Sequence, residues 1–223
     1  VRRQRQMCIR DSINTWYMKR FAGLSEDGLS LWYYTDKETN EEKTTTTYST
    51  GDFYLCGDPN PDLYGGFGTS ITFHGFDLST QFSYLVGGLT YDYGYAGMMG
   101  NPTATSVGNR WHKDVLKAWS PENPSSTIPR WYFNDLNTTG SSDRFLIDGS
   151  YLNLQNIQVG YTLPDSWTSH LKIKNLRLYF VCDNVYYWSK RKGLDPRRSI
   201  SGVGTSGKIA PFRTYSGGIS LQF

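Results

Sequence analysis

The sequence predicts an all-β protein that forms part of an antiparallel transmembrane β-barrel. Three observations lead to this fold class: an alternating strand at the C-terminus, a segregation of short and long links, and the lack of any long apolar run. In Arg213–Phe223, the apolar side chains of Tyr215, Ile219, Leu221 and Phe223 alternate with hydroxyl and amide side chains. A period of two is typical of a β-strand whose two faces meet different surroundings. A soluble sandwich would turn the polar face to water, whereas a transmembrane barrel turns the apolar face to lipid.

The composition excludes some classes of protein and is compatible with a barrel. The 223 residues include 17 Tyr, 11 Phe, 7 Trp and 23 Gly. No apolar run of about 18 residues occurs, which excludes a transmembrane helix. The net charge of +3 gives no support to a nucleic-acid partner. Cys8, Cys56 and Cys182 have neither the even count of a disulfide scaffold nor a metal-type spacing. Composition alone also fits a soluble, aromatic-rich β protein.

Residues 1–13 differ in character from the rest of the chain. They begin with several basic residues, but no apolar segment follows, so they do not form a signal peptide. We interpret residues 1–13 as a non-native or disordered leader, and residues 14–223 as the folded part. The alternative is a basic arm that binds nucleic acid or lipid.

About seven segments have the pattern of strands. The clearest is a hairpin, because two alternating runs flank the two-residue turn His74–Gly75. The alternation changes phase near Gln155–Asn156, which predicts a β-bulge. The predicted strands are 14–23, 28–35, 65–73, 76–86, 151–163, 174–188 and 213–223.

The links between these strands separate by length. Those at 24–27, 74–75 and 164–173 are short, and those at 36–64, 87–149 and 189–209 are long. Consecutive antiparallel strands alternate in direction, so the short links fall on one side of the sheet and the long links on the other. Outer-membrane barrels have short periplasmic turns and long extracellular loops. Within the longest link, Trp111, Val115 and Trp119 recur every four residues and predict a short helix over 107–119.

Four blocks of sequence resemble the C-terminal half of the SusC/RagA-like TonB-dependent outer-membrane transporters. Each block alone is common among β proteins, but together they stand in the order and spacing of that family. They cover about residues 14–223. The blocks are Gly57–Ser70 with His74–Tyr84, Asp143–Pro164, Leu176–Tyr179 with Asp183–Asn184 and Lys190–Pro196, and the terminal strand.

This resemblance implies a role in nutrient uptake rather than catalysis. It implies an outer-membrane barrel of about 22 strands with an N-terminal plug, driven through the TonB complex, in a member of the Bacteroidota. It also implies a SusD-like surface lipoprotein as a lid, and an oligosaccharide or peptide as cargo. About seven strands do not close such a barrel, since single-chain barrels have even numbers from about eight upward. We therefore expect the chain to be the C-terminal part of a longer one, unable by itself to transport or to couple to TonB.

The sequence offers no catalytic constellation, metal site or cofactor motif. His74, His112 and His170 are scattered, and the acidic residues sit in turn-forming contexts. Aromatic side chains of the longest link are candidates for contact with cargo or lid, although packing within the loop is the alternative. These candidates are Trp111, Trp119, Trp131 and Tyr132, with Phe133 beside them.

The terminal strand has a separate candidate role. An alternating last strand that ends in an aromatic residue resembles the signal read by the barrel-assembly machinery, carried here by Tyr215, Ile219, Leu221 and Phe223. Outer-membrane lipid is the partner expected for its apolar face. An alternative function from another class is a secreted carbohydrate-binding β-domain that uses its Trp and Tyr residues as a glycan platform.

Overall fold

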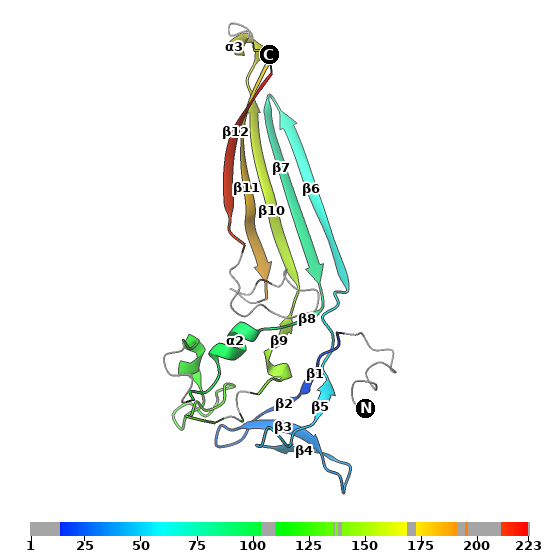
Figure 1. The fold of residues 1–223 in the computed structure, drawn as a ribbon, viewed down its shortest axis with the longest axis vertical. Helices are drawn as coiled ribbons and strands as arrows, with labels where there is room; N and C mark the ends of the chain where they lie inside the picture. Colours follow the sequence, from blue (N-terminus) through cyan, green and yellow to red (C-terminus); the bar gives the residue numbers. More distant parts are fainter. Residues whose placement is uncertain are drawn as a thin grey trace. The chain divides into compact units, whose positions relative to one another are not determined.

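The computed structural model describes residues 14–103, 110–135, 137, 140–168, 173–190, 195 and 211–222. The chain forms two compact units (Figure 1). We call Pro61–Gly87, Gly149–Arg197 and Lys208–Phe223 the sheet unit. We call Val1–Asn60, Gly88–Asp148 and Arg198–Gly207 the insertion unit, because Gly88–Asp148 lies within the longest link of the predicted barrel.

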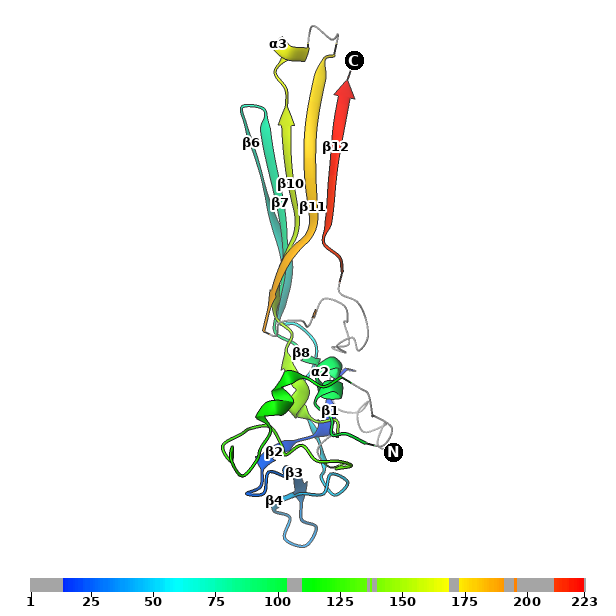
Figure 2. The same cartoon turned by 90° about the vertical axis from the view of Figure 1, so that its left-hand side faces the viewer.

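The sheet unit is one antiparallel sheet of long strands (Figures 1 and 2). The strand order is β12-β11-β10-β7-β6, and the short helix α3 (Asp165–Thr168) lies in the link between β10 and β11. Each strand is longer than the few residues usual in globular proteins. The strands are β6 (Leu63–Phe73), β7 (Phe76–Val86), β10 (Tyr151–Thr162), β11 (Asn175–Ser189) and β12 (Thr214–Gln222).

The predicted local features of this sheet are confirmed. His74 and Gly75 have φ of 48° and 86°, and positive φ at both central positions is the geometry that two-residue hairpins favour. The register of β10 shifts between Leu154 and Asn156 against both neighbouring strands, so the bulge is present. The terminal strand pairs with β11 as expected, with Ile219 opposite Leu178.

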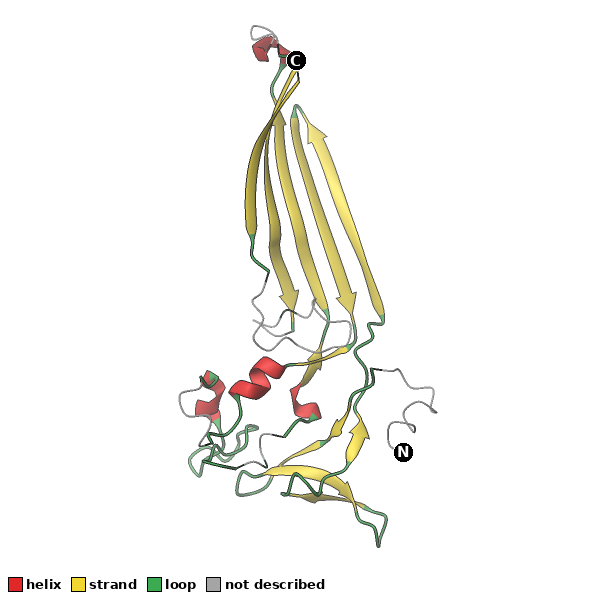
Figure 3. Ribbon diagram, in the orientation of Figure 1, coloured by secondary structure: helices red, strands yellow, loops and turns green. Residues whose placement is uncertain are grey.

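The links of the sheet unit also separate as predicted. Because β6, β7, β10, β11 and β12 pair antiparallel, the links at 74–75 and 163–174 leave one end of the sheet, and those at 87–150 and 190–213 leave the other (Figure 3). The short turn is also bonded to the end of β10, since Thr162 N donates to Gly75 O at 2.7 Å.

The insertion unit contains short elements around a small core. Met18, Tyr91, Met99 and Phe145 are its buried hydrophobic cluster. The pairs are β1 with β5, β2 with β3 with β4, and β8 with β9. The elements are β1 (Tyr17–Lys19), β2 (Phe21–Leu24), β3 (Ser30–Thr35), β4 (Glu42–Thr45), β5 (Phe53–Leu55), β8 (Leu89–Tyr91), α2 (Tyr93–Met98), the 3-10 helices η1 (Lys113–Lys117) and η2 (Asp143–Phe145), and β9 (Leu146–Asp148).

Two predicted strands lie outside the long sheet. Segments 14–23 and 28–35 form β1, β2 and β3 of the insertion unit, so the long sheet holds the other five of the predicted strands. The physical reason is that these segments bury their apolar residues in the insertion unit itself, where Trp32 is only 1% exposed. They pair with β4 and β5, two strands that the sequence placed in a polar link.

The predicted helix over 107–119 is present only as η1, with residues 107–109 outside the described part. His112 ends the extended segment before it, and its Nδ1 accepts from Asp114 N at 3.2 Å. Ala118 has an extended ψ of 156° and stops the helix. No helix among the described residues is long and apolar enough to cross a membrane.

Candidate functional site

The sheet unit has one apolar face. Cross-strand rows place side chains of one chemistry beside each other, as in Phe73–Phe76–Tyr161–Leu178–Ile219. Many of these side chains are exposed although they are large and apolar; Phe73 is 69% and Ile219 66% exposed. An exposed apolar surface of this extent needs an apolar partner. A second row on the same face is Ile71–Leu78–Val159–Phe180.

The opposite face carries hydroxyl and amide groups. One row is Ser70–Ser79–Gln158–Val181–Ser216, and the next is Gly68–Gln81–Asn156–Asp183–Thr214. Within these rows Asn156 Nδ2 donates to Asp183 Oδ1 at 2.7 Å. In a further row Asn153 Nδ2 donates to Ser83 Oγ at 3.4 Å. The sheet therefore has one apolar face and one polar face.

An ion pair on the polar face joins β7 to β11 across β10. Arg177 Nε donates to Asp77 Oδ1 at 2.9 Å, and Nη2 donates to Oδ2 at 2.5 Å, a bidentate arrangement. In the register Gly160 is paired with Asp77 and Arg177 is paired with Thr162, so the ion pair passes diagonally over Gly160. A Cβ atom at Gly160 would come within 2.7 Å of Arg177 Nη2, so the pair requires glycine at this position.

The predicted barrel-assembly residues lie on the apolar face of β12. Tyr215, Ile219 and Leu221 are all exposed. They pair with Cys182, Leu178 and Leu176 of β11. Phe223 is outside the described residues. The alternation predicted for this strand is therefore realised up to Gln222.

The tryptophan candidates are mainly engaged in packing. Trp111 and Trp131 meet edge to face, with ring centroids 5.4 Å apart, and both indole Nε1 atoms donate to Gly100 O. Trp119 covers Gly28, where a Cβ would lie 2.5 Å from its Cγ. The structure does not bring these three rings together into one open platform.

Tyr132 differs from the other candidates because it is 64% exposed, as is Phe133 at 58%. The Arg130 guanidinium lies over the Tyr132 ring, 5.4 Å from its centroid. Stacking with a cation holds the ring in place while its other surface stays accessible. Of the predicted contact residues, Tyr132 is the best exposed.

Comparisons with known proteins identify the family. No protein-family model matches the chain. TonB-dependent receptor P3 of Formosa agariphila is 30% identical over 212 residues, which are 91% of this chain and 20% of the relative. TonB-dependent receptor SusC of Bacteroides thetaiotaomicron is 27% identical over 180 residues, 79% of this chain and 17% of the relative.

Comparison with solved structures points to the same family of transporters. The RagAB peptide transporter superposes with a TM-score of 0.76 at 24% identity, over 94% of this chain and 23% of that one. The RagAB peptide importer in its open-open state superposes with a TM-score of 0.74 at 25% identity, over 94% and 22%. The chain belongs to the TonB-dependent receptors of the SusC/RagA type. It spans about one fifth of the length of the relatives it matches.

Membership of the SusC/RagA type settles three expectations. The predicted fold class is confirmed, because the chain aligns with part of the RagA barrel. TonB-dependent receptors sit in the bacterial outer membrane, as the sequence predicted. They are transporters without enzymatic activity, which agrees with the lack of a catalytic motif.

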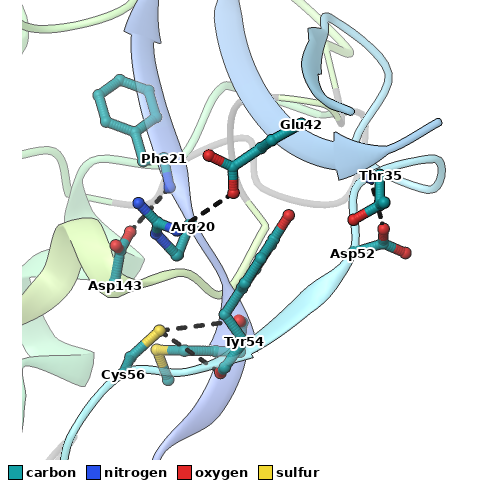
Figure 4. Close-up of polar contacts among 9 residues, drawn as sticks. Arg20, Phe21, Thr35, Glu42, Asp52, Tyr54, Cys56 and Asp143 are labelled. Carbon is teal, nitrogen blue, oxygen red and sulfur yellow. Dashed lines mark hydrogen bonds and ion pairs between the residues drawn. The ribbon is translucent and has the colours of Figure 1, made fainter. Parts of the chain in front are cut away.

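In this SusC/RagA-type chain, polar contacts tie β2 to η2, and Arg20, the residue before β2, to β4 (Figure 4). Asp143 Oδ1 accepts from Phe21 N at 2.8 Å, and burial raises the pKa of the Asp143 carboxyl. Arg20 Nη1 lies 3.3 Å from Glu42 Oε1, and its guanidinium lies over the rings of Tyr33 and Tyr54. These contacts connect segments of the insertion unit that are far apart in the sequence, since Phe21 and Asp143 are 122 residues apart.

Two further reactive groups of this receptor segment, the half-buried Cys56 and the buried Lys19, are engaged in contacts within the insertion unit. Cys56 Sγ contacts Tyr54 O at 3.5 Å, and burial raises the pKa of its thiol, which disfavours the nucleophilic thiolate. Lys19 is 4% exposed and donates from Nζ to Tyr48 O and Ser49 O, while burial lowers its pKa.

The histidines are also structural where the structure describes them. His74 adopts the left-handed conformation of the hairpin turn, and its ring packs against Phe73. His112 caps η1, as described above, and His170 lies outside the described residues. Among the residues described, no group of three His, Cys, Asp or Glu side chains could hold a metal ion.

Proposed function

We propose that this chain forms part of the wall of an outer-membrane active importer. The observation that supports the proposal is the two-faced sheet, whose exposed apolar rows run the length of strands that carry polar rows on the other side. The apolar face meets lipid and the polar face lines a wet lumen, as in other outer-membrane barrels. The Asp77–Arg177 pair then faces the lumen, where both charges stay hydrated.

We infer the partners of the importer from its membership of the SusC/RagA type. A SusD-like surface lipoprotein covers the extracellular side, and the TonB complex supplies energy through parts of the receptor beyond these residues. The cargo is an oligosaccharide or a peptide; the solved relatives carry the name of peptide transporters. Tyr132, with Phe133, contacts the lid, since exposed Tyr beside Arg has the composition of an interface anchor. The terminal strand is read by the barrel-assembly machinery.

Two neighbouring residues of the central strand β10 test which face meets lipid. Ile157 lies on the apolar face between Thr80 and Cys182, and Gln158 lies on the polar face between Ser79 and Val181. An arginine on the lipid face near the bilayer midplane costs about 2–4 kcal/mol. In a full-length receptor, Ile157→Arg should therefore reduce heat-modifiable barrel in the outer membrane, and Gln158→Arg should leave it unchanged.

The second readout is uptake of labelled oligosaccharides and peptides by cells that carry each variant. Gln158→Arg should alter uptake while the barrel assembles, because the new cation projects into the lumen. Equal assembly of both variants, or loss of assembly only for Gln158→Arg, contradicts the proposed orientation. A receptor that is soluble and monodisperse without detergent would instead support the carbohydrate-binding module.

A further inference from the structure

A small cavity in the insertion unit is lined by two arginines. It lies among the residue after α2, the segment around η1, the 128–131 segment and η2. Its walls include the apolar side chains of Met99, Val115 and Ile128, with Arg130 and Arg144 as the charged members. None of the described residues that line it is acidic. The cavity therefore concentrates positive charge in apolar surroundings.

Arg144 has aromatic neighbours in place of a counter-ion. Its guanidinium lies 5.2 Å from the ring centroid of Phe21 and 5.3 Å from that of Phe145. Burial lowers the pKa of Arg144, the direction expected for a cation that is desolvated without compensation by a carboxylate. Within the described part of the chain, no ion pair includes Arg144 or Arg130.

Arg130 brings an unsatisfied donor to the same cavity. Its Nε atom is buried and has no hydrogen-bond partner among the described residues. A buried donor without an acceptor costs about 1–3 kcal/mol, and more when the group is charged. The cavity thus has one buried donor without an acceptor, on Arg130, and a second desolvated guanidinium, that of Arg144, with no carboxylate in its lining. An anion in the cavity would supply the missing negative charge and accept a hydrogen bond.

The size of the cavity limits the ligand. Its volume is about 10 Å³, close to the smallest space that holds one water molecule. A sulfate or a sugar acid is far larger than this, whereas a monatomic halide exceeds one water molecule by only a few tenths of an ångström in radius. We propose that this cavity binds one monatomic anion, of which chloride is the natural example, between Arg130 and Arg144.

The anion would also stabilise the exposed aromatic segment. Arg130 contributes both to the cavity and to the stack on Tyr132, and Trp131 lines the cavity with its indole donating to Gly100 O. Fixing the Arg130 guanidinium therefore fixes the ring that is stacked on it. Anion binding and the order of residues 130–132 should be coupled.

Bromide, which scatters anomalously and replaces chloride, locates the anion. In crystals of a full-length receptor grown in sodium bromide, we expect an anomalous difference peak within hydrogen-bond reach of both guanidinium groups. Arg144→Met should remove the peak. Arg20→Met is the matched control, because Arg20 already pairs with Glu42 and does not line the cavity; it should keep the peak. A cavity that holds only water in bromide overturns the proposal.

Hydrogen exchange tests the same site without crystals, in the folded receptor. Amides of residues 128–135 are compared in sodium chloride and in sodium gluconate at equal ionic strength, since gluconate does not fit the cavity. At an anion concentration ten times Kd, linkage should slow opening of this segment about tenfold. Arg144→Met should abolish the difference and Arg20→Met should keep it. Equal exchange of the unmodified receptor in both salts would overturn the proposal.

Discussion

Trp119 was a candidate for contact with cargo or lid, and its packing on Gly28 can be tested directly. Gly28 has a φ of +74°, which L-residues with a side chain rarely adopt. A Cβ there would lie 2.5 Å from Trp119 Cγ and 2.5 Å from Cε3. The backbone at Gly28 is also anchored, because its carbonyl accepts from Arg130 N at 2.9 Å. Gly28→Ala therefore has two separate costs, one in the backbone and one against the indole.

The two costs can be separated with a double-mutant cycle. The left-handed conformation costs an alanine about 1–2 kcal/mol, and displacing a packed side chain costs about 1–3 kcal/mol more. In a Trp119→Ala background the second cost disappears, because the indole is gone, while the backbone cost remains. The expected coupling between the two positions is thus about 1–3 kcal/mol.

Hydrogen exchange of a full-length receptor in detergent provides the assay. The free energy of opening is measured for amides of residues 25–33 and 110–135 in the parent, both single variants and the double variant. An equal effect of Gly28→Ala with and without Trp119 would refute the packing role. Trp119 would then be free to bind a partner, and the residue would return to the list of contact candidates.

Three further outcomes are expected. Because burial raises the pKa of Asp143, its contribution to stability is fully present below the ordinary carboxyl pKa of about 3.9 and is lost as pH rises through the folded-state pKa. The protection factors of residues 141–148, in which the intrinsic exchange rate at each pH is divided by the observed rate, should therefore fall over that range. Asp143→Asn should remove this pH dependence of the protection factors. Tyr132→Ala should weaken lid binding about tenfold, as loss of an interface anchor does, whereas Trp111→Ala should change affinity less, measured by titrating the purified lipoprotein. Gly160→Val should separate the ion pair beside it and reduce heat-modifiable barrel, while Gly217→Val, with only Tyr179 O within 4 Å, should leave assembly unchanged.

The sheet could be predicted because its signals are local. Alternation in 76–86 gives the strand, and the residues at 74–75 tolerate the positive φ that a tight hairpin needs. The bulge follows from the phase change near Asn156, which any strand must absorb to keep its apolar residues on one face. Each of these features depends on residues a few positions apart.

The insertion unit could not be predicted in the same way. A short alternating segment such as 28–35 looks alike in a barrel wall and in a small independent sheet, and only its partners decide between them. Residues 42–45 lie in a stretch rich in charges and threonine, and 53–55 is a run of only three residues in the same long link, so the sequence favoured a loop. The spacing of Trp111 and Trp119 was ambiguous in a similar way. It does not show whether these side chains pack within the loop or are exposed to cargo or lid.

On the polar face, strand pairing makes neighbours of residues that are far apart in the sequence. Asp77, Gly160, Tyr179 and Gly218 are adjacent in one row, although they come from four strands. Long side chains alternate with glycines, and each glycine gives room to its neighbour: the Asp77–Arg177 pair crosses Gly160, and the Tyr179 ring covers Gly218, where a Cβ would lie 2.9 Å from its Cε1. The side chains therefore lie along the sheet rather than standing away from it. A methyl group added at either glycine would displace the side chain that lies over it, so both glycines are needed for this arrangement of the polar face.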